Sequence, residues 1–261
     1  MSILSLRTIA EQDLGISGDM SVDTDIYGYR YCDSDSRLFG ELDPGEMLLG
    51  KGTADQPTAR SLRRHLETVS GPSVDLVLFL VGHRPDFSGV VTVEQVVKMQ
   101  YAVQQARDIY AQRDLGLRRV EWGYITPEQA GGFTEITSVL EGALLTQEFS
   151  GRPGAIDVFL VQTIGTKAGR SPVKGPCTKD SLGLRTGIVM ELNQTPQFSG
   201  VVVAHEVGHY LGLHHTTSDP DNFMYGPKIF HPRCDPSETQ TDVTADQAAT
   251  MKEHCTVHNT V

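Results

Sequence analysis

Three histidines and one glutamate lie in the stretch from residue 205 to residue 215, which reads HEVGHYLGLHH. His205 and His209 are four residues apart, so on a helix they occupy one face, one turn from each other. Two imidazoles placed in this way can share one metal ion at about 2.0–2.1 Å from each nitrogen. Glu206 is rotated from the first histidine by about 100°. Its carboxylate is therefore expected beside the metal, where it can contact a water molecule bound to the ion.

His215 can join this site only if the chain turns. On a continuous helix it would lie roughly 9 Å beyond His209 and on another face. Gly212 lies between them, and glycine tolerates the left-handed conformation that commonly ends helices. We expect the helix to end there and His215 to return as a third ligand. Three neutral imidazoles leave a fourth position open for water, as in catalytic zinc sites. His214 has the wrong spacing, and we expect it to point outward or to hydrogen-bond a ligand from behind.

This stretch resembles the HExxHxxGxxH signature of the metzincin clan of zinc endopeptidases. In that clan a turn with a methionine follows, and Met224, in Asn-Phe-Met-Tyr-Gly, is the candidate here. The short interval between His215 and Met224 and the Met-Tyr pair resemble the matrixins, whereas Asn-Phe-Met is similar to the pappalysins. The resemblance covers residues 201–225. It implies that the three histidines are zinc ligands, that Glu206 is the general base and that Met224 lies beneath the metal.

Tyr225 is the one candidate whose place in the motif is shifted. In several metzincins a tyrosine two positions after the methionine approaches the zinc. Here Tyr225 follows the methionine directly and residue 226 is glycine. Tyr225 therefore stays a candidate contact to substrate or to an oxyanion.

Such a site predicts hydrolysis. A zinc ion lowers the pKa of its bound water to about 7 and can polarise a peptide carbonyl. Glu206 would accept the proton of the attacking water and deliver a proton to the leaving amine, with no covalent intermediate. The sequence thus predicts a zinc metalloendopeptidase with one catalytic Zn²⁺ and a peptide or protein substrate. Two alternatives remain open: a zinc hydrolase for one dedicated peptide or a non-protein amide, and a catalytically silent zinc-binding module, against which the presence of Glu206 argues.

Composition restricts the partners and the location. The 261 residues include 22 basic and 33 acidic residues, a formal net charge of -11. This balance argues against nucleic acid or an anionic membrane as a partner. No apolar run approaches the ~20 residues of a membrane span, and residues 1–11 lack the apolar core of a secretory signal. We expect a cytoplasmic monomer, with secretion as the alternative because many metzincins are secreted.

The hydrophobic pattern predicts an α/β fold of the α+β type. Apolar or alternating runs predict strands at 74–81, 118–125, 156–164 and 187–192. Helical patterns cover 93–115 with Gly116 as C-cap, 134–149, and 244–253 with Thr244 as N-cap. The metzincin resemblance implies a twisted mixed sheet with a long backing helix and an active-site zinc helix. It also implies an edge strand for an extended peptide, within residues 166–190.

The sequence is expected to divide near residue 70. Residues 71–261 are expected to form the catalytic domain, and residues 1–70 an N-terminal extension packed on it or a pro-segment. The extension contains a predicted strand at 25–31, a predicted helix at 59–69 and an acidic run, 33–35, that could bind calcium but is more typical of a loop.

The four cysteines, at 32, 177, 234 and 255, allow three pairings. One disulfide among the last three is expected in an oxidising compartment, and free buried thiols otherwise.

Overall fold

The computed structural model describes residues 71–82, 93–151, 153–165, 168–179, 186–191, 195–226 and 240–260. The predicted extension at 1–70, with its strand, helix and calcium candidates, lies outside these residues. Cys32 and Cys234 also lie outside them.

The centre of the fold is a mixed β-sheet with strand order β2-β1-β3-β5-β4, in which β6 pairs with β1 beside this path. The strands are β1 (Gly71–Val81), β2 (Gly116–Ile125), β3 (Ile156–Val161), β4 (Gly169–Arg170), β5 (Gly187–Glu191) and β6 (His258–Thr260). The pairs β1/β2, β1/β3 and β3/β5 are parallel. The last strand, β4, runs antiparallel to β5 and forms the edge of the path. The predicted mixed α/β sheet is confirmed, and so is an edge strand within residues 166–190.

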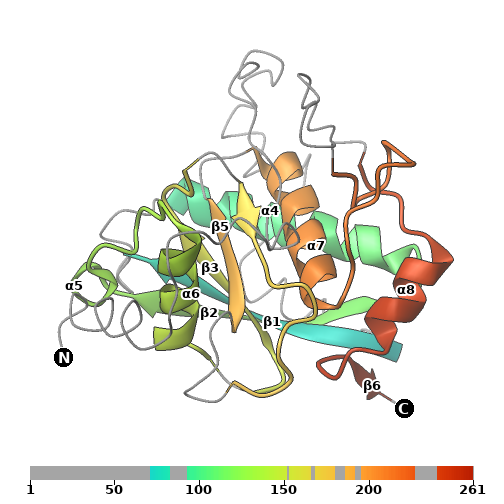
Figure 1. The fold of residues 1–261 in the computed structure, drawn as a ribbon, viewed down its shortest axis with the longest axis horizontal. Helices are drawn as coiled ribbons and strands as arrows, with labels where there is room; N and C mark the ends of the chain where they lie inside the picture. The colour runs from blue at the N-terminus through green and yellow to red at the C-terminus, as the bar shows by residue number, and fades with distance from the viewer. Residues whose placement is uncertain are drawn as a thin grey trace, which may run out of the picture.

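The helices are α4 (Val93–Ala111), α5 (Pro127–Ala130), α6 (Val139–Glu148), α7 (Pro196–Tyr210) and α8 (Ala245–Lys252). Helices α4 and α7 lie together on one face of the sheet, and α6 lies on the other (Figure 1). Helix α8 lies at the end of the sheet near β6 (Figure 1). The helix that carries the first two histidines thus packs against α4 and against the same face of the sheet.

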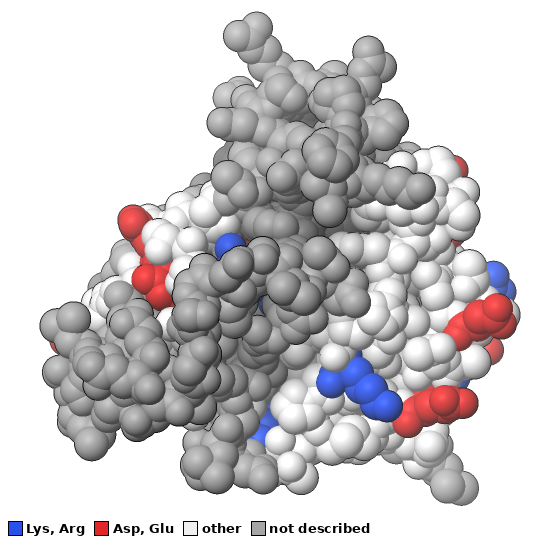
Figure 2. Space-filling view, in the orientation of Figure 1, with Lys and Arg blue, Asp and Glu red and all other residues white. Residues whose placement is uncertain are grey.

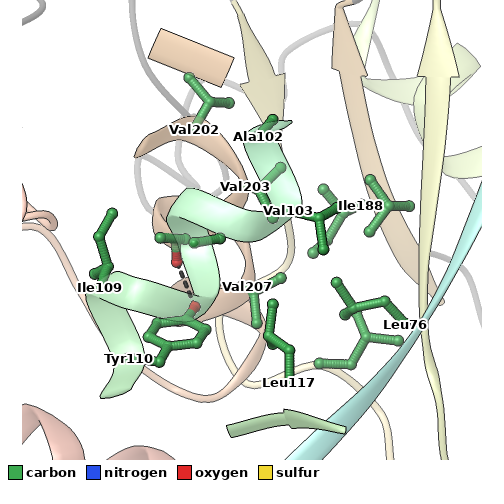
Figure 3. Close-up of a cluster of buried hydrophobic side chains, with 14 of the residues drawn as sticks. Leu76, Ala102, Val103, Ile109, Tyr110, Leu117, Ile188, Val202, Val203 and Val207 are labelled. Carbon is green, nitrogen blue, oxygen red and sulfur yellow. Dashed lines mark hydrogen bonds between the residues drawn. The ribbon is translucent and has the colours of Figure 1, made fainter. Parts of the chain in front are cut away.

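The central strands are buried on both faces, which explains their continuous apolar sequences. In β1, Leu76, Leu78 and Leu80 belong to the core beneath α4 and α7, while Val81 belongs to the core beneath α6. Strand β3 divides in the same way, because successive side chains point to opposite faces. Figure 3 shows the larger core and the bond that joins its two helices, in which the hydroxyl of Tyr110 on α4 donates to the carbonyl of Ala204 on α7 at 2.6 Å.

The structure corrects two predicted helices. The helix predicted to reach Leu115 ends at Ala111, and Gly116 begins β2 instead of capping the helix. Asp114 takes a positive φ of 53° in the turn between them, where polar residues of its kind are tolerated. The helix predicted from residue 134 begins only at Val139, because Ser138 caps it by accepting a hydrogen bond from the Glu141 amide at 3.1 Å.

Candidate metal centre

The three predicted histidines come together around one point. His205 and His209 project from α7, and His215 returns to them from the chain after the helix. The Nε2 atom of His215 lies 3.0 Å from the Nε2 atom of His205 and 3.0 Å from that of His209. His205 and His209 are buried, whereas His215 is exposed. The point that they surround is therefore closed on the helix side and accessible from the side of His215.

Two backbone carbonyls fix the tautomers of the buried pair. The Nδ1 atom of His205 lies 2.8 Å from the carbonyl oxygen of Phe223, and Nδ1 of His209 lies 2.7 Å from that of Leu213. A carbonyl oxygen only accepts, so both Nδ1 atoms carry the proton and donate it. Both Nε2 atoms then present lone pairs, and His215 could donate a proton to only one of them. A cation between the rings would bind all three Nε2 atoms. A tetrahedral zinc ion with bonds of about 2.0–2.1 Å needs these nitrogens about 3.3 Å apart, close to the 3.0 Å that separates Nε2 of His215 from each of the other two.

Burial keeps these histidines neutral. The pKa of His205 lies well below its usual value, because the ring is buried and because His209 and His215 lie close to it. Burial, and next the neighbouring His215, lower the pKa of His209 to about 3. Metal binding requires neutral imidazole. His205 and His209 are therefore in the form that binds a cation at neutral pH.

The turn at Gly212 brings His215 back, as predicted. Helix α7 ends at Tyr210, and Gly212 follows with a φ of 106°. The amide of Gly212 donates to the carbonyl of His209 at 2.8 Å, and the amide of Leu213 donates to that of Gly208 at 3.0 Å. These bonds use carbonyl groups that the end of a helix leaves without partners. His214 is exposed, which favours the first of its two predicted alternatives, pointing outward, over a hydrogen bond to a ligand.

Glu206 is fully buried and lies against the edge strand. A Cβ atom at Gly169 of β4 would come within 2.6 Å of the Glu206 Oε1 atom. Only glycine at position 169 allows this approach, because any side chain there would collide with the carboxylate. The Glu206 carboxylate thus lies between α7, which carries His205 and His209, and β4 at the edge of the sheet.

The turn that contains Met224 packs under the same helix. Met224 and Phe223 are fully buried. A Cβ atom at Gly208, between the two helical histidines, would come within 2.7 Å of the Met224 sulfur and 2.9 Å of the Phe223 ring. The turn also holds the third histidine, because the amide of Thr216 donates to the Met224 carbonyl at 2.9 Å.

Gly226, directly after Tyr225, is adjacent to the third histidine. A Cβ atom at Gly226 would come within 2.6 Å of Cγ and 2.9 Å of Nδ1 in His215. A larger residue would displace this ring, which gives a steric reason for glycine. Tyr225 is half-buried and its amide donates to the carbonyl of Asn222 at 2.9 Å. The role of its hydroxyl stays a prediction.

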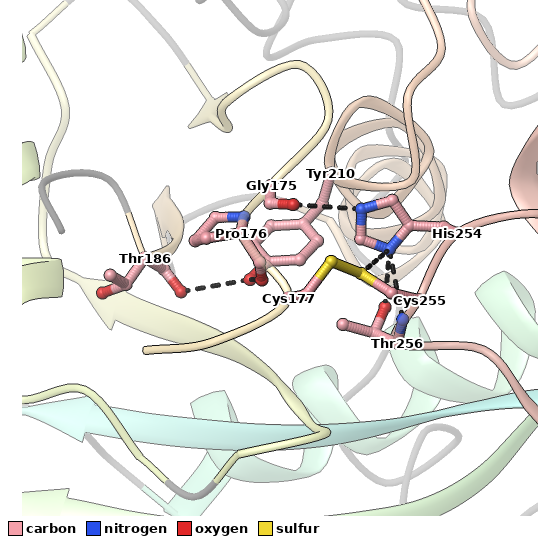
Figure 4. Close-up of a disulfide and its surroundings, with 8 residues drawn as sticks. All are labelled: Gly175, Pro176, Cys177, Thr186, Tyr210, His254, Cys255 and Thr256. Atoms are coloured by element: carbon pink, nitrogen blue, oxygen red, sulfur yellow. Dashed lines mark hydrogen bonds between the residues drawn. A yellow bond between two sulfur atoms is a disulfide. The ribbon is translucent and has the colours of Figure 1, made fainter. Parts of the chain in front are cut away.

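A loop and a disulfide support the end of α7, and the sequence patterns did not reveal this contact. The amides of Lys174 and Gly175 donate to the carbonyls of His209 and Tyr210, at 2.9 and 2.7 Å. Two residues further along, Cys177 forms a disulfide with Cys255, 78 positions away. Figure 4 shows the ring of His254, which hydrogen-bonds the Gly175 carbonyl at 3.0 Å, next to this disulfide. One disulfide among the three later cysteines is thus confirmed.

The hydroxyl of Tyr210 braces the same loop from the helix. It lies 3.0 Å from the carbonyl oxygen of Pro176 and 3.4 Å from that of Thr186 (Figure 4). Burial, and next the charge of Asp157, keep the pKa of this hydroxyl above its usual value. It therefore remains a donor throughout the physiological pH range.

The described surface carries no large patch of one charge in the view of Figure 2, where acidic and basic side chains lie side by side at the right of the picture. No helix within the described residues is long and apolar enough to cross a membrane.

No model of a known protein family matches this chain. Disintegrin and metalloproteinase domain-containing protein 12 of Mus musculus is 38% identical over 53 residues, which are 20% of this chain and 6% of that protein. The chain therefore spans only a small part of the length of this curated relative. Among solved structures, metalloproteinase-II from Bacteroides fragilis matches with a TM-score of 0.44 and 13% identity, over 74% of this chain and 60% of that chain. Archaemetzincin from Methanopyrus kandleri matches with a TM-score of 0.45 and 13% identity, over 70% of this chain and 95% of that chain.

Proposed function

We propose that this protein is a zinc-dependent endopeptidase of the metzincin type. The observation that carries the proposal is the convergence of three imidazole Nε2 atoms next to a buried carboxylate and an edge strand. The site fits zinc because its donors are neutral nitrogens, two of them oriented by backbone carbonyls, as is usual for metal-binding histidines. The short match to a protein whose name includes a metalloproteinase domain agrees with it.

Each residue has a distinct part in this proposal. His205, His209 and His215 would hold a zinc ion, which when bound would supply Lewis acidity and lower the pKa of a water molecule to about 7. Glu206 accepts a proton from the attacking water and passes a proton to the leaving nitrogen. Met224 supports the helix from below, by way of Gly208.

The substrate in this proposal is an extended peptide alongside β4. A peptide can pair with the last strand of a sheet through main-chain hydrogen bonds, which tolerate many sequences. The close approach of Glu206 to Gly169 supports this placement, because it brings the proton acceptor next to the strand that would hold the scissile bond. A protein substrate is therefore favoured over a small amide, which would not use an edge strand.

The disulfide supports secretion over a cytoplasmic location. Disulfides such as Cys177–Cys255 persist mainly in oxidising compartments. Because the bonded segments support the end of the zinc helix, a stable disulfide is coupled to an intact metal site.

The experiment that tests the proposal is digestion of a mixed peptide library by the zinc-loaded chain, read by mass spectrometry. We expect cuts within peptides that vanish when a chelator removes the zinc and return when zinc is restored. If one zinc is bound per chain and no peptide is cut, a dedicated substrate or a silent zinc module replaces the general endopeptidase. Cuts that persist in the chelator would refute the zinc mechanism.

A further inference from the structure

Asn222 lies in the turn that supports two of the three histidines. Its side chain is buried, and its Oδ1 atom accepts a hydrogen bond from the amide of Met224 at 2.9 Å. The carbonyl of Phe223 in this turn accepts from His205, and the carbonyl of Met224 accepts from the amide next to His215. A change in the turn would therefore alter the positions of both His205 and His215.

The side chain that contacts Asn222 belongs to the last helix of the fold. The Nε2 atom of Gln247 donates to Oδ1 of Asn222 at 2.9 Å, and Nδ2 of Asn222 donates to Oε1 of Gln247 at 2.9 Å. These two amides thus form a closed pair with two hydrogen bonds. The pair joins residues 25 positions apart in the chain and connects α8 to the turn.

The orientation of both amides is set by backbone groups outside the pair. The amide of Met224 only donates, so the atom of Asn222 that faces it must be the oxygen. The amide of Thr244, the N-cap of α8, donates to Gln247 at 2.9 Å, so the oxygen of Gln247 is fixed in the same way. The two assignments agree, because each leaves a nitrogen opposite the partner's oxygen.

We infer that Gln247 is a positioning residue for the metal site, which acts by orienting the Asn222 amide and with it the turn that carries Phe223 and Met224. This inference rests on the proposed function, since it concerns the same zinc site. It assigns to α8 a role that reaches beyond packing. The capping box that starts this helix also sets the geometry under the zinc ligands.

The structure suggests a substitution that separates this role from simple helix capping. Glutamate is as suitable as glutamine at the third position of a capping box. Gln247→Glu therefore keeps the acceptor for the Thr244 amide, but it places a carboxylate oxygen against Oδ1 of Asn222. If the Asn222 amide keeps its orientation, its Oδ1 atom loses the hydrogen bond from residue 247 and lies against a negatively charged oxygen. If the amide rotates instead, Oδ1 no longer accepts the hydrogen bond from the Met224 amide.

A matched control exists in α5, whose capping box has the same residue types. There the amide of Thr126 donates to Oε1 of Gln129 at 2.9 Å, and the amide of Gln129 donates back to the Thr126 hydroxyl at 3.3 Å. Gln129 is exposed and belongs to the helix at the far side of the sheet from α7 (Figure 1). Gln129→Glu makes the same chemical change without a partner such as Asn222.

The test measures the zinc dissociation constant of the full chain by competition with a chelator, and the visible absorption spectrum after substitution with cobalt. We expect Gln247→Glu to bind zinc about tenfold more weakly, in the range found when groups behind metal ligands are changed, with an altered cobalt spectrum. Gln129→Glu should bind within twofold of the unmodified chain and keep its spectrum. Zinc affinity and a cobalt spectrum unchanged in Gln247→Glu would overturn the inference.

A second variant keeps the test decisive if the glutamate prevents folding. Gln247→Met has nearly the same length and makes none of the three hydrogen bonds of the Gln247 side chain, the two with Asn222 and the one from the Thr244 amide. It should therefore also weaken zinc binding, and unchanged binding would overturn the inference. The outcome for the proposed function is separate. A chain that binds zinc but cuts no peptide refutes the endopeptidase, whereas equal zinc binding by the Gln247 variants refutes only the positioning role.

Discussion

The substitution Gly208→Ala places a methyl group where the turn with Met224 meets the zinc helix. The added carbon would lie 2.7 Å from the Met224 sulfur and 2.9 Å from the Phe223 ring. Favourable contacts between such atoms are about 3.5–4.0 Å long, so the turn must move by about 1 Å. Both side chains are fully buried, and the shift displaces the Phe223 carbonyl that orients His205.

The expected magnitude combines two opposing effects. Overpacking a buried site costs about 1–3 kcal/mol, and alanine gains about 1 kcal/mol over glycine within a helix. The zinc-free protein should therefore lose roughly 0–2 kcal/mol of its free energy of unfolding. Each tenfold loss of zinc affinity removes about 1.4 kcal/mol more from the zinc-loaded form. The difference from the unmodified chain should thus be larger with zinc than without it.

The control is Gly142→Ala in α6, where there is room for the methyl group. Its nearest neighbours would be Val189 and Ile136 at 3.7 and 3.8 Å, which are ordinary contacts. This variant should gain up to about 1 kcal/mol and bind zinc like the unmodified chain. Urea unfolding of both variants, with and without zinc, makes the comparison. If Gly208→Ala is as stable as Gly142→Ala and keeps its zinc affinity, Met224 and Phe223 do not pack against Gly208 as closely as described.

Two further predictions concern the ligands and their support. His215→Ala should weaken zinc binding as severely as His209→Ala, by more than about 100-fold, while His214→Ala should change it by less than about threefold. Full zinc occupancy after His215→Ala would assign the third ligand to another residue. Replacing both Cys177 and Cys255 by alanine should lower the free energy of unfolding by about 2–5 kcal/mol and weaken zinc binding, because the loop before Cys177 caps the zinc helix. A double variant with unchanged stability in thermal unfolding and an unchanged zinc dissociation constant would show that the disulfide supports neither.

The local parts of the site were predictable from the sequence. The interval between His205 and His209 defines one helix face, and Gly212 marks the point where the chain must turn. Both features depend only on the geometry of the helix and on the backbone freedom of glycine. The long strands were predictable for a similar reason, since residues buried on both faces form continuous apolar runs.

The parts that depend on contacts between distant segments were not predictable. The resemblance implied an edge strand within residues 166–190 but not its position, because β4 has only two residues, in a loop rich in glycine and proline, and is a strand only through its pairing with β5. The partner of Cys177 lies 78 positions away, and the three possible pairings of four cysteines look alike in sequence. The same is true of Asn222 and Gln247, whose amides meet only after α8 is in place.

Errors at the ends of helices have local causes that periodicity does not register. The pattern through Leu115 continues past the true end of α4 because Leu115 is also buried, as the residue that leads into β2. Its amide donates to the carbonyl of Tyr110 at 3.3 Å, which closes the turn after the helix. A buried apolar residue just beyond a helix thus extends the apparent pattern.

The most direct test of the proposed function is the turnover of Glu206→Gln on a peptide that the unmodified chain cleaves, with zinc content measured on the same samples. The substitution keeps the size of the side chain and removes the proton acceptor. The proposal predicts one zinc per chain in both proteins and a loss of cleavage of about 10²–10⁴-fold, the usual contribution of a general base. Cleavage within a few fold of the unmodified chain, at full zinc occupancy, would show that Glu206 is not the base.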